Sequence, residues 1–138
     1  MIVLDTNVVS ELMRPKPADS VVRWIGGRSA TSLCTTTITQ AEILHGVLLL
    51  AKGKRRDAIE KAAEAMFDKD FAGRVLPFGT DAARVYARIS AARRRSGRPI
   101  AQFDAQIAAI ARSTGASLAT RNVSDFEGCG IDVADPWG

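Results

Sequence analysis

The alternation of two kinds of segment most constrains what this chain can fold into. Short apolar runs with the length and composition of buried strands lie at 1–4, 31–38, 74–78 and 117–120, with a further short run at 131–133. Apolar residues recur at helical spacing in the segments 6–13, 19–25, 39–52, 55–71, 80–92 and 101–113. Because helices separate the first four strands, the sequence predicts a three-layer α/β/α fold whose central parallel sheet has four to five strands.

The size and composition of the chain predict one domain, residues 1–138. Its apolar fraction of 46% and charged fraction of 25% are ordinary for a soluble globular protein. No apolar stretch approaches the ~20 residues of a membrane span, and Asp5 interrupts the first apolar run too early for a signal peptide. We therefore expect a cytoplasmic protein with no membrane partner. The two cysteines show no paired metal-ligand spacing and receive no functional role.

The basic residues are clustered. The formal net charge is +4, and one run comprises Lys52, Lys54, Arg55 and Arg56. A second run comprises Arg93, Arg94, Arg95 and Arg98. The second run is consistent with a solvated helix end, where cations favour the helix dipole, and equally with contact to nucleic-acid phosphates.

Polar side chains follow two of the predicted strands. Asp5 ends the first apolar run, and Asn122 and Asp125 come after the fourth. Open α/β sheets bind their ligands at the carboxyl ends of parallel strands. These positions make the three residues candidates for a functional site.

Two further acids are predicted in the first turns of helices. Thr39 and Glu42 have the spacing of a capping box, which by itself favours a structural role for Glu42. Asp104 complements the positive end of its helix dipole, which is also a structural role. Gly46, inside the helix that carries Glu42, predicts a close approach of another backbone.

Convergence of these acids at one edge of the sheet predicts a divalent cation. Clustered carboxylates repel one another unless a cation or a proton lies between them. An all-oxygen ligand set suits Mg²⁺, for which Mn²⁺ can substitute, better than zinc. Such a cation activates water for attack on a phosphodiester. In a basic protein without a nucleotide-cradling loop, a polynucleotide is the expected substrate.

Five stretches, in order, resemble the PIN-domain ribonucleases of the VapC toxin type, the toxic half of type II toxin–antitoxin pairs. The matching stretches are residues 2–7, residues 39–43 with Gly46, residues 97–100 with 103–108, residues 120–122 with 125–126, and residues 136–137. The resemblance implies a PIN-like fold and a Mg²⁺-dependent endoribonuclease. It also implies a homodimer and a cognate antitoxin, which forms a higher-order complex and whose C-terminal segment lies across the cleft, often with a basic side chain among the carboxylates.

The resemblance also implies roles for individual residues. Asp5 and Asp104 would be the principal metal ligands, Glu42 would complete the acidic cluster, and the hydroxyls of Thr6 and Thr120 would orient the ligands. These roles take precedence over the cap and dipole interpretations of Glu42 and Asp104.

The fourth acid of the family is left open between Asn122, an amide at one candidate position, and Asp125, one turn further on. Two alternatives to the ribonuclease remain. One is a degenerate PIN module that binds RNA or a protein without cutting, which the retained acids disfavour. The other is a structure-selective DNA nuclease, which the short length of the chain disfavours.

Overall fold

A computed structural model describes residues 1–138 and contains one sheet of five parallel strands. The strands are β1 (Ile2–Leu4), β2 (Leu33–Thr36), β3 (Val75–Leu76), β4 (Ser117–Ala119) and β5 (Val133–Ala134). Their order is β3-β2-β1-β4-β5, and every neighbouring pair is parallel. The predicted parallel sheet is confirmed.

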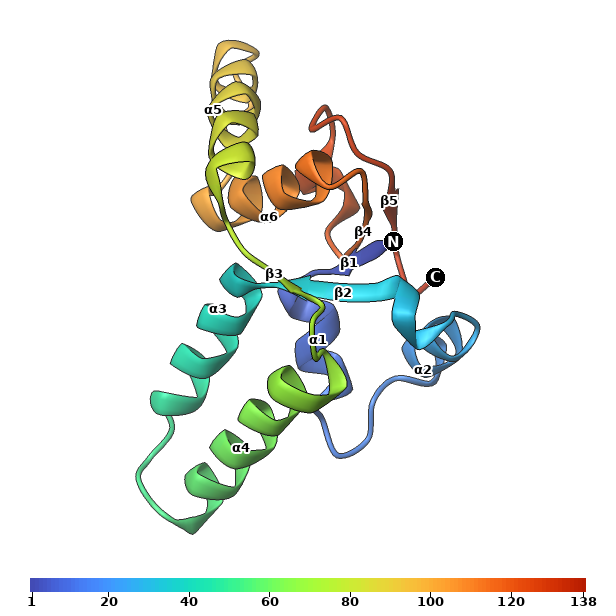
Figure 1. Ribbon diagram of the computed structural model, residues 1–138, viewed down its shortest axis with the longest axis vertical. Coiled ribbons are helices and arrows are strands. Elements are labelled where there is room, and N and C mark those ends of the chain that lie inside the picture. Colours follow the sequence, from blue (N-terminus) through green and yellow to red (C-terminus); the bar gives the residue numbers. More distant parts are fainter.

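Six α-helices cover the two faces of this sheet. They are α1 (Thr6–Leu12), α2 (Asp19–Gly26), α3 (Thr37–Leu48), α4 (Lys54–Ala65), α5 (Thr80–Arg95) and α6 (Gln102–Ser113). The first four helices lie on one side of the sheet, and α5 and α6 lie on the other (Figure 1). The predicted three-layer α/β/α architecture is therefore confirmed. None of the helices combines the length and the apolar character required to cross a membrane.

Alternate side chains of the strands pack into two separate apolar clusters, one on each face of the sheet. Val3 packs in a cluster with Ile89 of α5 and Ile107 of α6, whereas the next residue, Leu4, packs with Val8 of α1 and with residues of α2 and α3. Successive side chains of a strand point to opposite faces, so a strand buried on both faces is apolar throughout. This explains why the strand runs read as continuous apolar stretches.

The start of α3 differs from the prediction. The strand ends at Thr36, whose hydroxyl accepts a hydrogen bond from the Thr39 N–H at 3.1 Å and so caps the helix that begins at Thr37. Thr39 therefore lies inside the first turn, and the predicted capping box is wrong. Glu42 lies beyond the first turn, which contains no acidic residue. Its carboxylate is free for other contacts.

Two predicted helices begin at the expected residues but without a side-chain cap, and one predicted helix changes form before its end. Asp19 and Thr80 are the first residues of α2 and α5, after Ala18 and Gly79, and neither helix has a side-chain cap. The predicted helix 55–71 is α-helical to Ala65 and continues as a π-helical turn over Met66–Asp70. Local propensity located these helices but not the groups that satisfy their ends.

The strand order creates a crevice between β1 and β4. The chain leaves β1 through α1 and α2 on one face of the sheet and enters β4 from α6 on the other face (Figure 1). Ligands of open α/β sheets bind outside the carboxyl ends of the strands at such a reversal. Asp5 directly follows β1 at this point, and Thr120 directly follows β4.

Candidate active site

Asp5 occupies the centre of this crevice as a buried carboxylate, with only 3% of its surface exposed. It caps α1, accepting the Thr6 N–H at 2.8 Å, and it accepts the Thr120 hydroxyl at 2.7 Å. Burial raises the pKa of the Asp5 carboxyl; the two hydrogen bonds partly oppose this rise, and the nearby charge of Asp125 adds to it. No lysine or arginine forms an ion pair with Asp5.

Thr120 organises the floor of the crevice. Its fully buried hydroxyl donates to Asp5 and accepts hydrogen bonds from the Asn122 backbone N–H at 3.2 Å and the Asn7 side-chain amide at 3.4 Å. The carbonyl oxygen of the Asn7 side chain in turn accepts the Arg121 N–H at 3.3 Å. Asn7 was not among the residues predicted for the site, although it follows Asp5 and Thr6 directly at the strand end.

Thr6 links Asp5 to Glu42. The Thr6 hydroxyl donates to Glu42 Oε1 at 2.8 Å and lies 3.0 Å from the Thr39 hydroxyl. This hydrogen bond joins the start of α1 to α3 and holds one carboxylate oxygen of Glu42 next to the residue after Asp5 in the chain, which is Thr6. The contact of Thr6 with Glu42 is consistent with an orienting role. Thr39 is fully buried and belongs to the same arrangement, although its sequence pattern predicted only a cap.

Asp104 lies in the first turn of α6, as predicted, and is partly buried. Burial, followed by the charges of Asp5, Asp125 and Glu42, raises the pKa of the Asp104 carboxyl to about 6. Because the charges of Asp5, Asp125 and Glu42 all act on Asp104, these four acids from four separate segments lie in the same region of the molecule.

These acids fit a hard divalent cation in chemistry and charge. Their donor atoms are all oxygens. Their negative charges repel one another, and no basic side chain forms an ion pair with them. No group of three or more histidine, cysteine, aspartate or glutamate side chains is arranged so that it could hold a metal ion. In proteins, Mg²⁺ usually keeps several waters and is held by one or two carboxylates.

Asn122 and Asp125 differ in their relation to the site. Asn122 precedes the short 3₁₀ turn Val123–Phe126 and contacts Thr120 through its backbone N–H. Asp125 lies within that turn, and its charge raises the pKa of both Asp5 and Asp104. Of these two residues, Asp125 is electrostatically coupled to the acidic cluster.

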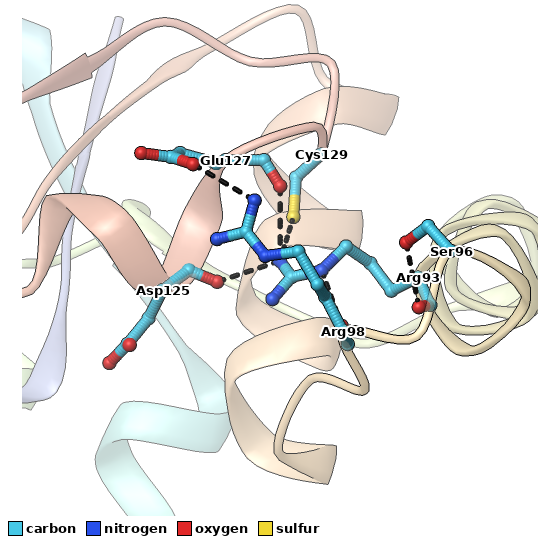
Figure 2. Close-up of polar contacts among 6 residues, drawn as sticks. All are labelled: Arg93, Ser96, Arg98, Asp125, Glu127 and Cys129. Atoms are coloured by element: carbon cyan, nitrogen blue, oxygen red, sulfur yellow. Dashed lines mark hydrogen bonds and ion pairs between the residues drawn. The ribbon is translucent and has the colours of Figure 1, made fainter.

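The predicted RNA-binding arginines do not form one surface. Arg94, Arg95 and Arg98 are exposed, but Arg93 is only 8% exposed. Its guanidinium donates to backbone oxygens inside the molecule (Figure 2). Arg93 therefore does not fit the prediction of phosphate contact, because packing against a neighbouring loop withdraws it from the surface.

An apolar groove begins at the site. It has a volume of about 550 Å³ and runs between α1, α3 and α4, with Thr6 and Glu42 in its lining and Val47 and Ile59 among its apolar residues. Gly46 also lines it, and a β-carbon on Gly46 would meet no atom within 4 Å. The prediction of a close backbone approach at Gly46 is wrong within this chain, because the space beside it belongs to the groove.

Comparison with known proteins identifies close relatives over nearly the whole chain. The family model described as PIN domain matches residues 2–127. A Sinorhizobium fredii protein named VapC ribonuclease Y4jK is 42% identical and aligns over 99% of this chain and 98% of its own length. The crystal structure of FitAcB from Neisseria gonorrhoeae superposes with a TM-score of 0.92 at 38% identity, covering 99% of both chains. VapBC-5 from Mycobacterium tuberculosis, of the VapBC family of toxin–antitoxin systems, gives a TM-score of 0.69 at 29% identity over 96% of this chain and 94% of that chain.

Proposed function

Because the chain belongs to the PIN-domain family and resembles VapC-type toxins along its whole length, we propose that it is a toxin of a type II toxin–antitoxin system that cleaves RNA as a metal-dependent endoribonuclease. The observation that carries this proposal is the acidic cluster. Asp5 and Asp104 converge at the β1–β4 crevice with raised pKa values and without a basic partner. In this proposal a divalent cation supplies the missing positive charge, and an RNA phosphodiester is the substrate.

The PIN-domain VapC nucleases are generally dependent on a divalent metal. For this chain we assign Mg²⁺, replaceable by Mn²⁺, with Asp5 and Asp104 as its principal ligands and Glu42 and Asp125 as further carboxylates around it. When bound, the cation supplies an activated water and neutralises charge that develops on the phosphate. Asp125 is the better candidate for the fourth acid, because its charge acts on both principal ligands and Asn122 brings no charge.

The protein's own groups orient this chemistry. Two hydrogen bonds fix the Asp5 carboxylate, from the Thr120 hydroxyl and the Thr6 N–H. The Thr6 hydroxyl occupies Glu42 Oε1, which leaves Glu42 Oε2 to accept a proton from the attacking water. We expect hydrolysis by a metal-activated water to leave a 3′-hydroxyl and a 5′-phosphate.

The exposed arginines provide contacts for the RNA backbone. Arg94 and Arg95 end α5, and Arg98 lies in the connection to α6, whose first turn carries Asp104. A basic segment close to the acidic site attracts a polyanion without repelling the cation directly.

A cognate antitoxin is the proposed protein partner, consistent with the naming of VapBC-5 as part of a toxin–antitoxin system. The groove between α1, α3 and α4 exposes mainly apolar surface, although Arg14 and Arg55 also line it, and it reaches Glu42 at the site. An amphipathic antitoxin segment with a basic residue at the site end matches this surface in shape and charge. We further propose that the toxin is a homodimer and forms a higher-order complex with its antitoxin.

Cleavage assays with the purified protein test the enzymatic proposal. RNA should be cut in Mg²⁺ and left intact in EDTA, whereas Asp5→Asn and Asp104→Asn should lose at least about a hundredfold in activity while remaining folded. Full activity in EDTA or in either variant would contradict the proposal. RNA binding without cutting would favour the degenerate module, and preferential cutting of DNA would favour the DNA nuclease.

A further inference from the structure

Arg93, in the last turn of α5, is a buried cation that forms no salt bridge. Its Nε–H donates to the Arg98 carbonyl at 2.7 Å, and its Nη1 donates to the carbonyls of Asp125 at 2.8 Å and Glu127 at 3.1 Å. The same nitrogen lies 3.7 Å from Cys129 Sγ. One side chain therefore satisfies three backbone carbonyls from two separate loops, as Figure 2 shows.

One of the two loops leads to a proposed site acid, and the other contains one. The Arg98 carbonyl belongs to the connection that leads into α6, where Asp104 occupies the first turn. The Asp125 and Glu127 carbonyls belong to the segment after β4, and the Asp125 carbonyl is part of a candidate ligand itself. Arg93 thus determines how the Asp125 segment lies relative to the start of α6.

The geometry of the guanidinium suits this role. Hydrogen bonds from an ionised donor are shorter and stronger than neutral ones, and the planar fork fixes their directions together. The other restraints on the Asp125 segment are backbone hydrogen bonds within its own turns, the buried side chains of Phe126 and Cys129, and an exposed ion pair between Arg98 and Glu127 at 3.0 Å. An exposed ion pair contributes little to rigidity, so Arg93 is the main polar anchor of this segment.

We propose that Arg93 is a positioning residue: without touching the RNA or the cation, it fixes the spacing between Asp104 and Asp125 and so sets the affinity of the site for a divalent cation. This inference rests on the proposed metal-dependent function and extends it to a residue outside the acidic cluster. Lysine retains the charge but presents a single nitrogen, which cannot reproduce the fork toward three carbonyls.

The test compares Arg93→Lys with Arg88→Lys, the same change at an exposed position of the same helix. Backbone hydrogen exchange should accelerate about tenfold or more across residues 122–129 in Arg93→Lys alone, with thermal unfolding still cooperative. The dissociation constant for Mn²⁺, measured by calorimetry, should rise about tenfold or more, and kcat for RNA should fall with little change in KM. Exchange rates and Mn²⁺ affinity equal to those of the unmodified protein would overturn the proposal.

Two further results keep the inference separate from the proposed function. If the unmodified protein cuts no RNA, the ribonuclease proposal fails, while the exchange comparison still decides whether Arg93 holds the segment. If Arg93→Lys does not fold, hydrogen exchange measured by NMR on the unmodified protein tests whether Arg93 holds the segment. The Arg93 Nη1 protons, which donate to the Asp125 and Glu127 carbonyls, and the Asp125 amide should then exchange with protection factors within about threefold of each other, because one opening event releases both. Much faster exchange at Arg93 would refute the anchor.

Discussion

Asp104→Asn should stabilise the metal-free protein while removing its activity. The pKa of the Asp104 carboxyl rises from its ordinary 3.8 to about 6, chiefly because of burial and then because of three neighbouring acids. Each pH unit corresponds to about 1.4 kcal/mol, so the full effect has an upper limit of about 3 kcal/mol. Asp104 is only partly buried, and solvent screening reduces the expected gain to about 1 kcal/mol.

The sign of this effect follows from proton linkage. Between pH 4 and 6 the folded state binds more protons at Asp104 than the unfolded state, so the free energy of unfolding falls as pH rises through this range. Asparagine cannot ionise and avoids this loss. The gain from the substitution should therefore be small near pH 4 and reach its full size above pH 7.

Thermal and urea unfolding in EDTA at pH 4 and pH 8 measure the difference. At pH 8 the Tm of Asp104→Asn should exceed that of the unmodified protein by about 3 °C, and the difference should shrink at pH 4. Asp68→Asn, an exposed change outside the site, serves as the control. Saturating Mg²⁺ should then stabilise the unmodified protein more than the variant. A variant that is less stable at pH 8, or equally stabilised at both pH values, would refute the electrostatic argument.

Three other substitutions test the arrangement around the site. Thr120→Val should lower Mn²⁺ affinity about tenfold and destabilise the fold by about 1–2 kcal/mol, since Asp5 loses a hydrogen bond in a buried position; calorimetry and urea unfolding measure both effects. Thr36→Ala should cost about 1 kcal/mol of unfolding free energy and Thr36→Ser less, because serine keeps the capping hydroxyl; equal losses would contradict the cap. Gly46→Ala should raise stability by about 0.5–1 kcal/mol in thermal unfolding, because a helical glycine with open space beside it gains helix propensity, whereas a loss would reveal an undetected contact.

Local pattern was sufficient for the elements and for one candidate site residue, Asp5. The periodicity of apolar side chains depends only on the neighbours along the chain, so it predicted the strands, the helices and the parallel sheet. Asp5 was identifiable because the first apolar run ends on it. Asp104, in the first turn of its helix, looked by itself like a residue that complements the helix dipole, and only the family resemblance assigned it to the site.

Contacts between distant segments were beyond local pattern. Glu42 looked like a cap because Thr39 stands three residues before it, but Thr36 caps the helix and Thr6, 36 residues away, binds the glutamate. Arg93 looked like one of four surface arginines, yet it reaches a segment 32 residues further along the chain. Composition does not distinguish a buried arginine from an exposed one, because the backbone carbonyls that satisfy it appear only after folding.

The sequence by itself determined a parallel α/β fold with carboxylates at the ends of a strand and a helix. Only the tertiary structure decided which of those carboxylates meet. The strand order β3-β2-β1-β4-β5 places β4 beside β1, and so brings Thr120 and the Asp125 segment to Asp5 from more than a hundred residues away in the chain. That order depends on how the two apolar faces of the sheet are covered, a property of the whole chain rather than of any one segment.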